Sequence, residues 1–144
     1  MNVITFNTEG IEMPKINQRI VREWVRQIAS DYGRLVGDIN YIFTDDQGIL
    51  DINRKFLNHD YYTDIITFDY SRRKLISGDL YISLDTVETN ADVVGAQYID
   101  ELYRVIIHGV LHLCGINDKG PGEREIMEDN ENKALEKLKS LFER

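Results

Sequence analysis

The stretch His108-Gly-Val-Leu-His-Leu-Cys-Gly-Ile-Asn-Asp118 places three potential metal ligands at spacings of four and six residues in one short, mostly apolar segment. On a helix, residues four apart differ by about 40° around the axis and by about 6 Å along it, so His108 and His112 can face one ion. Gly115 can end the helix in a left-handed conformation and turn the chain so that Asp118 reaches the same ion. The segment therefore predicts a metal site with His108, His112 and Asp118 as ligands.

This ligand set is typical of zinc. Two imidazole nitrogens and one carboxylate oxygen leave a fourth position for water or substrate, which distinguishes catalytic zinc sites from structural ones. We expect one Zn²⁺ per chain that activates a water molecule, and the chain is interpreted as a metal-dependent hydrolase. No side chain in the sequence stands out as a general base.

Each ligand also has a simpler interpretation. Asp118 lies in the polar turn at residues 117–122 and could cap only the helix that follows. His59, in a polar loop, is most simply a solvated residue, and it is the fallback third ligand. Cys114 is about 200° around the helix from His112, so we expect it to face away from the metal as a small buried hydrophobe.

Length and composition predict one globular domain over residues 1–144, the hydrolase domain itself. A chain of 144 residues suits a single core. Its first residues lack a basic stretch followed by an apolar one, and no apolar run approaches the roughly 18 residues needed to span a bilayer. A single cysteine permits no internal disulfide. We expect a cytoplasmic protein with no membrane partner.

The formal net charge of −8 argues against a generic electrostatic binder of nucleic acid, and no DNA partner is expected. A local basic site is still allowed. Arg54-Lys55 and Arg72-Arg73-Lys74 form two small basic clusters, for which solvated surface is the simplest interpretation.

Hydrophobic periodicity predicts an α+β fold, a small mixed sheet packed with helices around a central metal-binding helix. In the expected helix at residues 44–57, Thr44 begins an N-cap signal and Ile49, Ile52 and Phe56 form the inner stripe. Asp85 is expected to cap the next helix, and Ile126 to face inward from the last one. The other expected elements are strands at 3–6, 33–43, 64–70 and 79–84 and helices at 14–32, 85–96, 99–113 and 123–142.

The opening stretch resembles the signature H-G-x-L-H-L-x-G-Y-D-H of the YbeY-type endoribonuclease family. Upstream, Thr63-Asp-Ile-Ile-Thr-Phe68 is similar to the family's T-D-V-L-S-F, and Gly78-Asp-Leu-Tyr-Ile82 to its G-D-I-x-I. Asn53 matches a helix asparagine, and Glu123 to Met127 resembles a later E-x-x-M with altered spacing. The similarity covers residues 40–140, and the combination is far more specific than any single element.

The resemblance implies a single-strand-specific endoribonuclease that acts in rRNA maturation, at the 3′ end of 16S rRNA, and in ribosome quality control. It implies RNA as the partner, in the form of rRNA and the ribosomal subunit. Exposed bases could stack on Tyr61, Tyr62 or Tyr70, although these tyrosines are equally expected to be packing residues.

The sequence departs from the family pattern at three places. The third ligand, histidine in most members, is Asp118, whose harder oxygen makes Mn²⁺ or Mg²⁺ more competitive than usual, though still secondary to zinc. The Tyr-Asp before that ligand is Ile116-Asn117, and an arginine that many members carry falls at Leu57. Substitutes for that arginine in substrate binding are Arg54, Lys55 and Lys119.

Two other classes of function compete with the nuclease. Metallopeptidases with H-E-x-x-H-x-x-G-x-x-H share the ligand spacing, but Gly109 occupies the position of their glutamate base, so Glu123 or Glu125 would have to replace it. The third class is a non-catalytic, ribosome-associated module in which the metal only stabilises the fold.

Overall fold

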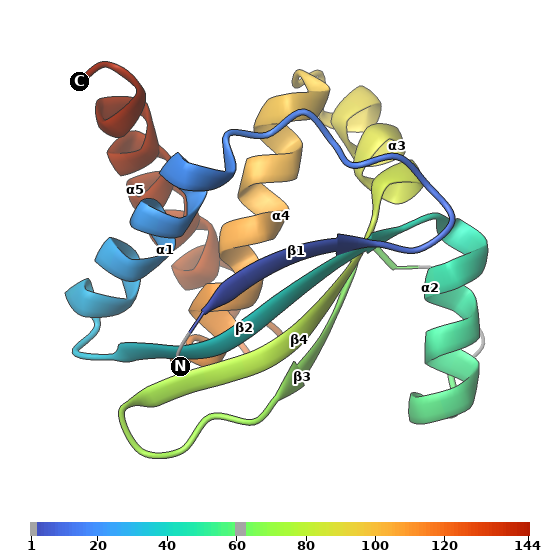
Figure 1. Ribbon diagram of the computed structural model, residues 1–144, viewed down its shortest axis with the longest axis horizontal. Helices are drawn as coiled ribbons and strands as arrows, with labels where there is room; N and C mark the ends of the chain where they lie inside the picture. Colours follow the sequence, from blue (N-terminus) through green and yellow to red (C-terminus); the bar gives the residue numbers. More distant parts are fainter. Residues whose placement is uncertain (1–2, 60–62) are drawn as a thin grey trace.

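Four strands form one mixed sheet (Figure 1). The structure is a computed structural model that describes residues 3–59 and 63–144. Strands β1, β2 and β4 are parallel to one another, and β3 pairs with β4 in the antiparallel direction at one edge of the sheet. In spatial order, the strands are β1 (Ile4–Thr8), β2 (Leu35–Thr44), β4 (Leu75–Ser83) and β3 (Ile65–Asp69).

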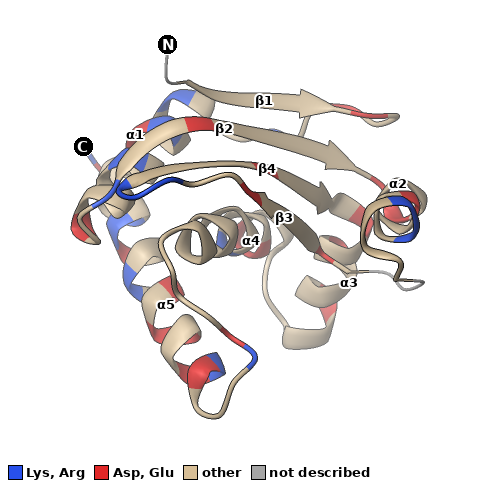
Figure 2. Cartoon of the chain, turned by 90° about the horizontal axis from the view of Figure 1, so that it is seen from below, with Lys and Arg blue, Asp and Glu red and all other residues tan. Residues whose placement is uncertain are grey.

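One face of the sheet is covered by α-helices, and a further helical segment lies beyond the ends of the strands (Figures 1 and 2). The covering helices are α1 (Gln18–Asp31), α3 (Leu84–Val94), α4 (Tyr98–Leu113) and α5 (Glu123–Phe142). The segment at the strand ends is α2 (Asp46–Ile52), which continues into η1 (Asn53–Leu57), a π-helical turn. The predicted α+β architecture with a small mixed sheet is therefore confirmed.

Alternation along β2 separates the two faces of the sheet. Tyr41 and Phe43 point toward the helices and are fully buried. Between such positions, Asn40 faces the other side, where it accepts a hydrogen bond from Thr5 Oγ1 at 2.6 Å and donates one to Asp79 Oδ1 at 3.0 Å. The polar ladder across three strands marks the face that the helices leave uncovered.

Helix α4 is the central helix that the apolar run predicted. Five of its side chains are completely buried: Leu102, Ile106, Ile107, Val110 and Leu111. Gly109 lets this helix approach the sheet closely, because a Cβ there would lie 2.9 Å from Ile65 Cδ1 and 3.2 Å from Leu80 Cδ1. The ligand-bearing face of α4 is thereby held against β3.

Two helix starts differ from the predictions because neighbouring side chains cap them. Helix α1 begins at Gln18 and not at Pro14, since the Asn17 side chain accepts a hydrogen bond from Ile20 N. Thr44 is the last residue of β2, and the cap of α2 is Asp45, whose carboxylate accepts from Gly48 N at 2.8 Å.

The expected cap of α3 was also wrong. Ser83 caps α3 by accepting a hydrogen bond from Thr86 N at 3.3 Å, while Asp85 lies in the first turn of the helix. The Asp85 carboxylate instead accepts from the backbone N of Asp46, at 3.0 Å, at the start of α2. Strand β4 starts at Leu75, four residues earlier than expected.

The inner stripe expected between residues 44 and 57 is only partly observed. Ile49 is fully buried, but Phe56 is 56% exposed and contacts the edge of Phe68, with ring centroids 5.8 Å apart. The π-helical turn changes the number of residues per turn, so the 3.6-residue spacing no longer holds beyond Asn53. Ile126, expected to face inward, is 54% exposed in the first turn of α5. In the described part of the chain, no helix combines the length and apolar character needed to cross a membrane.

Candidate metal centre

The loop after α4 brings the third predicted ligand back to the first two. Helix α4 ends in a Schellman motif, in which Gly115 N donates to His112 O at 2.9 Å and Ile116 N donates to Leu111 O at 3.0 Å. Gly115 has a φ of 96°, which a residue with a Cβ adopts only with strain. The predicted glycine turn is confirmed, and it places Asp118 beside the two histidines.

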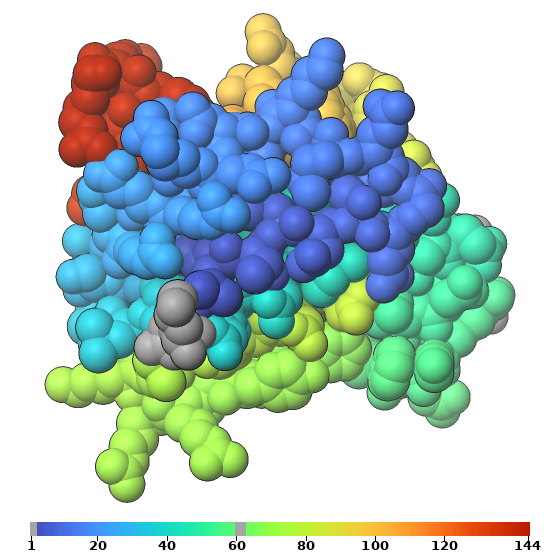
Figure 3. Space-filling model, viewed as in Figure 1, coloured from blue at the N-terminus to red at the C-terminus, as the bar shows by residue number. Residues whose placement is uncertain are grey.

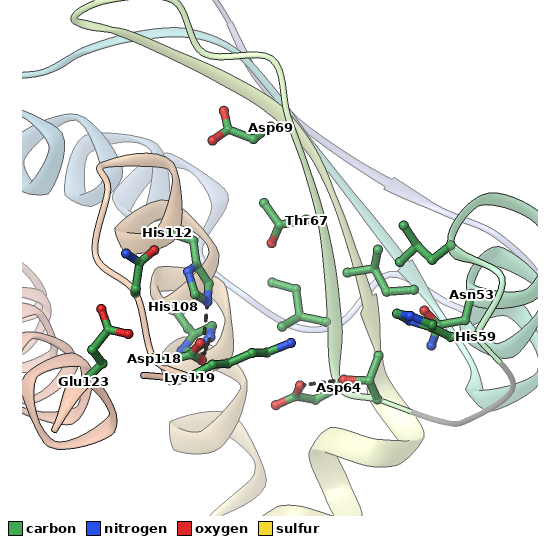
Figure 4. Close-up of a pocket in the computed structure, with 15 residues that line it drawn as sticks. Asn53, His59, Asp64, Thr67, Asp69, His108, His112, Asp118, Lys119 and Glu123 are labelled. Atoms are coloured by element: carbon green, nitrogen blue, oxygen red, sulfur yellow. Dashed lines mark hydrogen bonds and ion pairs between the residues drawn. The ribbon is translucent and has the colours of Figure 1, made fainter. Parts of the chain in front are cut away.

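The three side chains converge in a geometry that suits a metal ion (Figure 4). Asp118 Oδ2 lies 3.3 Å from His108 Nε2 and 3.4 Å from His112 Nε2, and one donor atom from each residue lies within 4.8 Å of the other two. Ligands about 2.1 Å from a tetrahedral zinc ion are separated by about 3.4 Å. The donor set therefore fits an ion of this kind, and a metal could be held here.

A buried carboxylate that the sequence analysis missed orients His108. Its Nδ1 lies 2.6 Å from Oε2 of Glu131 on α5, and Glu131 is only 7% exposed. The other oxygen of Glu131 accepts from Arg104 Nη1 at 2.9 Å. Because an ionised carboxylate can only accept, Nδ1 of His108 donates to Glu131, which leaves Nε2 as the nitrogen that can bind a metal when the ring is neutral.

A sequence signal for Glu131 does exist. It lies on the buried face of α5 with Met127, Ala134 and Leu138, at spacings of four, three and seven residues. A carboxylate in such an apolar stripe is costly to bury without a partner. The sequence therefore indicates a paired acid at this position, although it does not identify the partner.

The two histidines differ in their affinity for a proton. Burial lowers the pKa of His108, but the hydrogen bond to Glu131 and the charges of Glu131, Asp118 and Asp64 outweigh it, so the net shift is upward. The pKa of His112 is lowered, first by burial and then by the nearby His108. His112 therefore favours the neutral form that binds metals.

The ligand cluster lies in an open cleft of about 620 Å³ between α4 and strand β3 (Figure 4). His59, the fallback ligand, lies on the opposite wall, and the potential ligand cluster in the described residues contains His108, His112 and Asp118 without it. The walls also include Asn53, Leu57, Thr63, Asp64, Ile65, Ile66, Thr67, Asp69, Asn117, Lys119 and Glu123.

Of the three predicted substrate-binding cations, Lys119 lines this cleft. Arg54 and Lys55 are exposed and are not among its described lining residues, and Lys55 Nζ lies over the ring of Phe56, 5.3 Å from its centroid. Tyr70 is 59% exposed. The suggested stacking residues Tyr61 and Tyr62 lie outside the described residues.

The surroundings of Gly109 weaken the peptidase alternative. A side chain at this position would point at Ile65 and Leu80 of the sheet, so a glutamate base has no room there. Of the two proposed replacements, Glu123 lines the cleft and accepts a hydrogen bond from Gly120 N at 2.6 Å, whereas Glu125 is exposed and is not among the described lining residues.

The site combines nitrogen and oxygen donors that converge in an open cleft with a buried carboxylate that orients one of the imidazoles. These are the features of a metal-dependent hydrolase. Comparisons with known proteins narrow this class. The family model described as endoribonuclease YbeY matches residues 3–139, and the chain belongs to this family. The resemblance noted from the motif is thus confirmed.

Named relatives resemble the chain over most of its length. Endoribonuclease YbeY from Bacteroides thetaiotaomicron is 63% identical over 132 residues, which cover 92% of this chain and 96% of the relative. The protein of the same name from Porphyromonas gingivalis is 51% identical over 142 residues, covering 99% and 94%. A solution structure from Thermotoga maritima has a TM-score of 0.66 and 26% identity, and covers 98% of this chain and 92% of that one.

Proposed function

We propose that this protein is a single-strand-specific endoribonuclease that uses zinc and acts in rRNA maturation, at the 3′ end of 16S rRNA, and in ribosome quality control. The observation that carries the proposal is the convergence of His108, His112 and Asp118 in an open cleft of a chain that belongs to an endoribonuclease family. The rRNA and the ribosomal subunit are the proposed partners, and a cytoplasmic location fits this role.

The proposed ligands have separate tasks. His108 and His112 would offer their Nε2 atoms and Asp118 a carboxylate oxygen, with zinc preferred over Mn²⁺ or Mg²⁺ because two of the three donors are imidazoles. When bound, zinc supplies Lewis acidity that lowers the pKa of water and offsets charge on a phosphoryl oxygen. Glu131 holds the Nδ1 proton of His108 throughout, which fixes the ring for ligation.

The cleft favours an unpaired strand. Its wall is the edge strand β3, and Lys119 at the rim can contact a phosphate. Leu57 supplies an apolar surface to the cleft. Arg54 and Lys55 lie on the neighbouring surface, and we propose that they contact the same RNA. An open cleft lined by a single edge strand suits the splayed nucleotides of an unpaired strand better than a duplex.

The test is cleavage of a defined, partly single-stranded rRNA fragment by protein of measured zinc content. We expect specific cleavage by the wild type and its loss in His112→Ala and after treatment with EDTA, because both remove the ion from the cluster. The matched control is His59→Ala, which deletes the imidazole on the opposite wall and is expected to keep zinc at the wild-type stoichiometry.

Two outcomes would overturn the proposal. If wild type and His112→Ala cleave alike while zinc is stoichiometric only in the wild type, the cluster is not the nuclease centre. If the zinc-loaded protein leaves RNA intact but cuts peptides, the metallopeptidase alternative with Glu123 as base replaces it.

A further inference from the structure

The metal cleft is poor in the cations that an RNA strand requires. Its described lining residues include four carboxylates against one lysine: Asp64, Asp69, Asp118 and Glu123 against Lys119. The chain as a whole carries a formal charge of −8. A bound divalent ion offsets only part of this charge, so phosphates beyond the reacting one need positive charge from outside the cleft.

Such charge is concentrated where the cleft wall ends. The wall follows β3 as far as Asp69, and three residues later the chain reaches Arg72, Arg73 and Lys74, which we call the cationic hairpin. All three side chains are exposed, and none forms an ion pair with a residue that the structure describes. The hairpin projects from one end of the molecule (Figure 3), and Lys and Arg residues are grouped in this segment between β3 and β4 (Figure 2).

The cationic hairpin is held in place by its backbone. Arg72 and Leu75 exchange two hydrogen bonds of 2.9 Å, and Leu35 N donates to Lys74 O at 2.8 Å. Arg73 has a φ of 56°, a left-handed conformation that is strained for a residue with a Cβ. The turn therefore presents an arginine where glycine would be less strained.

A fourth cation connects the hairpin to the metal-binding loop. Arg34 Nη1 donates to the carbonyl oxygen of Arg73 at 3.2 Å. A Cβ on Gly115 would lie 3.6 Å from Arg34 Nη2, so the guanidinium lies beside the turn that brings Asp118 to the histidines. Arg34 thus lies between the hairpin and the turn that leads to Asp118.

We infer that the cationic hairpin, with Arg34, binds the phosphates of single-stranded RNA that extends from the metal cleft along β3. This inference rests on the proposed nuclease function. The five residue steps from Thr67 to Arg72 span up to about 17 Å, so only a substrate several nucleotides long reaches both regions. Tyr70, 59% exposed, lies between the cleft wall and the hairpin, where a base can stack on it.

The test is binding of a 2′-O-methyl RNA of about 12 nucleotides, which the enzyme cannot cut by attack of a 2′-hydroxyl, to the zinc-loaded protein. In the variant Arg72→Gln, Arg73→Gln, Lys74→Gln, we expect the slope of log affinity against log salt to fall by about 2, at about 0.7 for each lost contact. Between about 50 and 200 mM salt, wild-type affinity should therefore drop about 20-fold more than that of the variant.

The matched control replaces three exposed cations of α1 and α5, Arg19, Lys133 and Lys139, with glutamine and should keep the wild-type slope. A variant with only Arg72→Gln and Lys74→Gln leaves the strained turn residue in place and should show about two thirds of the fall in slope seen in the triple variant. Thermal melting checks that each variant is folded.

The outcomes separate the two proposals. If the wild type cleaves RNA and the cationic-hairpin variant binds with the wild-type slope, this inference is wrong while the nuclease function stands. If polyglutamate displaces the RNA and binds as tightly, an acidic protein partner explains the hairpin instead. If the wild type neither binds nor cleaves RNA, the proposed function itself fails.

Discussion

Glu131 determines which nitrogen of His108 is available at the candidate metal centre. The carboxylate is buried, accepts from Nδ1 at 2.6 Å and is itself held by Arg104. Partners of this kind raise the basicity of a ligand and fix its ring, and their loss typically weakens metal binding by about 10–100-fold. Glu131 is therefore a positioning residue, separated from the candidate metal position by the imidazole that it orients.

We expect Glu131→Gln to lower zinc affinity by about 10-fold and to change the maximal cleavage rate less than the zinc requirement. The amide can still accept from Nδ1 through its oxygen but no longer supplies a charge. Competition with a chromogenic chelator measures the affinity. Glu136→Gln, an exposed carboxylate on the same helix, is the control and should bind zinc like the wild type. Equal affinities for both variants would show that Glu131 has only a structural role.

Cys114 provides a pH-dependent test of the buried helix end. Burial raises the pKa of its thiol to about 11, although Arg34 partly opposes the shift. Since the thiolate is the reactive form, a pKa near 11 in place of the usual 8.5 reduces the reactive fraction at pH 8 by roughly 200-fold. We expect the folded protein to react with a thiol reagent at least that much more slowly than the protein in urea.

The rate should rise with pH up to about 11, as the folded thiol ionises. The folded protein should also lose stability as the pH rises from the ordinary thiol pKa toward 11, because only the unfolded chain releases this proton there. The chain has one cysteine, so the signal has one source. Fast labelling of the folded protein at pH 8 would show that the α4 end opens more easily than its contacts indicate.

At this scale the sequence identifies residues that are close along the chain. His108 and His112 are one helical turn apart, and the glycine that returns Asp118 is in the same segment, so helix geometry alone brings them together. Glu131 lies 23 residues from His108 on another helix. The two residues meet only because α4 packs against α5. Local periodicity carries no information about this tertiary contact.

Among the elements, α2 and α3 stabilise each other's first turns. Asp46 Oδ1 accepts from Ser83 Oγ at 2.7 Å and from Thr86 Oγ1 at 2.5 Å, and Asp85 accepts from Asp46 N. Ser83 also caps α3. Loss of its hydroxyl therefore removes one cap and one link between the two helices.

We expect Ser83→Ala to lower the free energy of unfolding by about 1–2 kcal/mol, the usual cost of a lost cap with a further hydrogen bond. Urea denaturation followed by circular dichroism gives the value. Ser140→Ala removes an exposed hydroxyl that bonds only to Glu136 O within α5, and it should change stability by less than about 0.5 kcal/mol. A similar loss in both variants would contradict the cap.

Element boundaries show where periodicity is insufficient. The long helices α4 and α5 occur almost where their apolar spacing predicted, because their patterns extend over many turns. The start of α3 was wrong because Ser83 and Asp85 are both good cap residues, and the choice depends on what α2 presents nearby. Phe56 was misplaced because no residue pattern announced the π-helical turn.

For the whole molecule, the order of the strands could not be deduced from the chain. Strand β4 follows β3 in sequence yet lies between β2 and β3 in the sheet. This arrangement puts β3 at the edge, where its side chains form the cleft wall opposite the histidines. The hydrophobic periodicity and the order of the elements predicted a mixed sheet but not which strand would face the candidate metal centre, since that depends on how α4 crosses the sheet.

The hydrophobic core does not include the candidate ligands. This separation determines how the stability of the fold should respond to chelation. Trp24 and Tyr41 are completely buried, and Trp24 Nε1 donates to Ala134 O at 2.7 Å, joining α1 to α5 on the side away from the cleft. Asp118 and both histidines retain exposed surface. A fold of this kind does not need a metal to bury its apolar side chains, unlike a zinc finger.

We therefore expect the protein to stay folded in excess EDTA, with one cooperative thermal transition. Zinc at about 100 times its dissociation constant stabilises a folded site by about 2.7 kcal/mol. For a domain near 150 residues, each kcal/mol corresponds to about 2–4 °C, so chelation should lower the melting temperature by about 5–10 °C. His112→Ala, which lacks one donor, should melt at nearly the same temperature with and without EDTA. A chain that unfolds at room temperature on chelation would make the metal structural, and one whose melting temperature is insensitive to zinc would not hold the ion at this cluster.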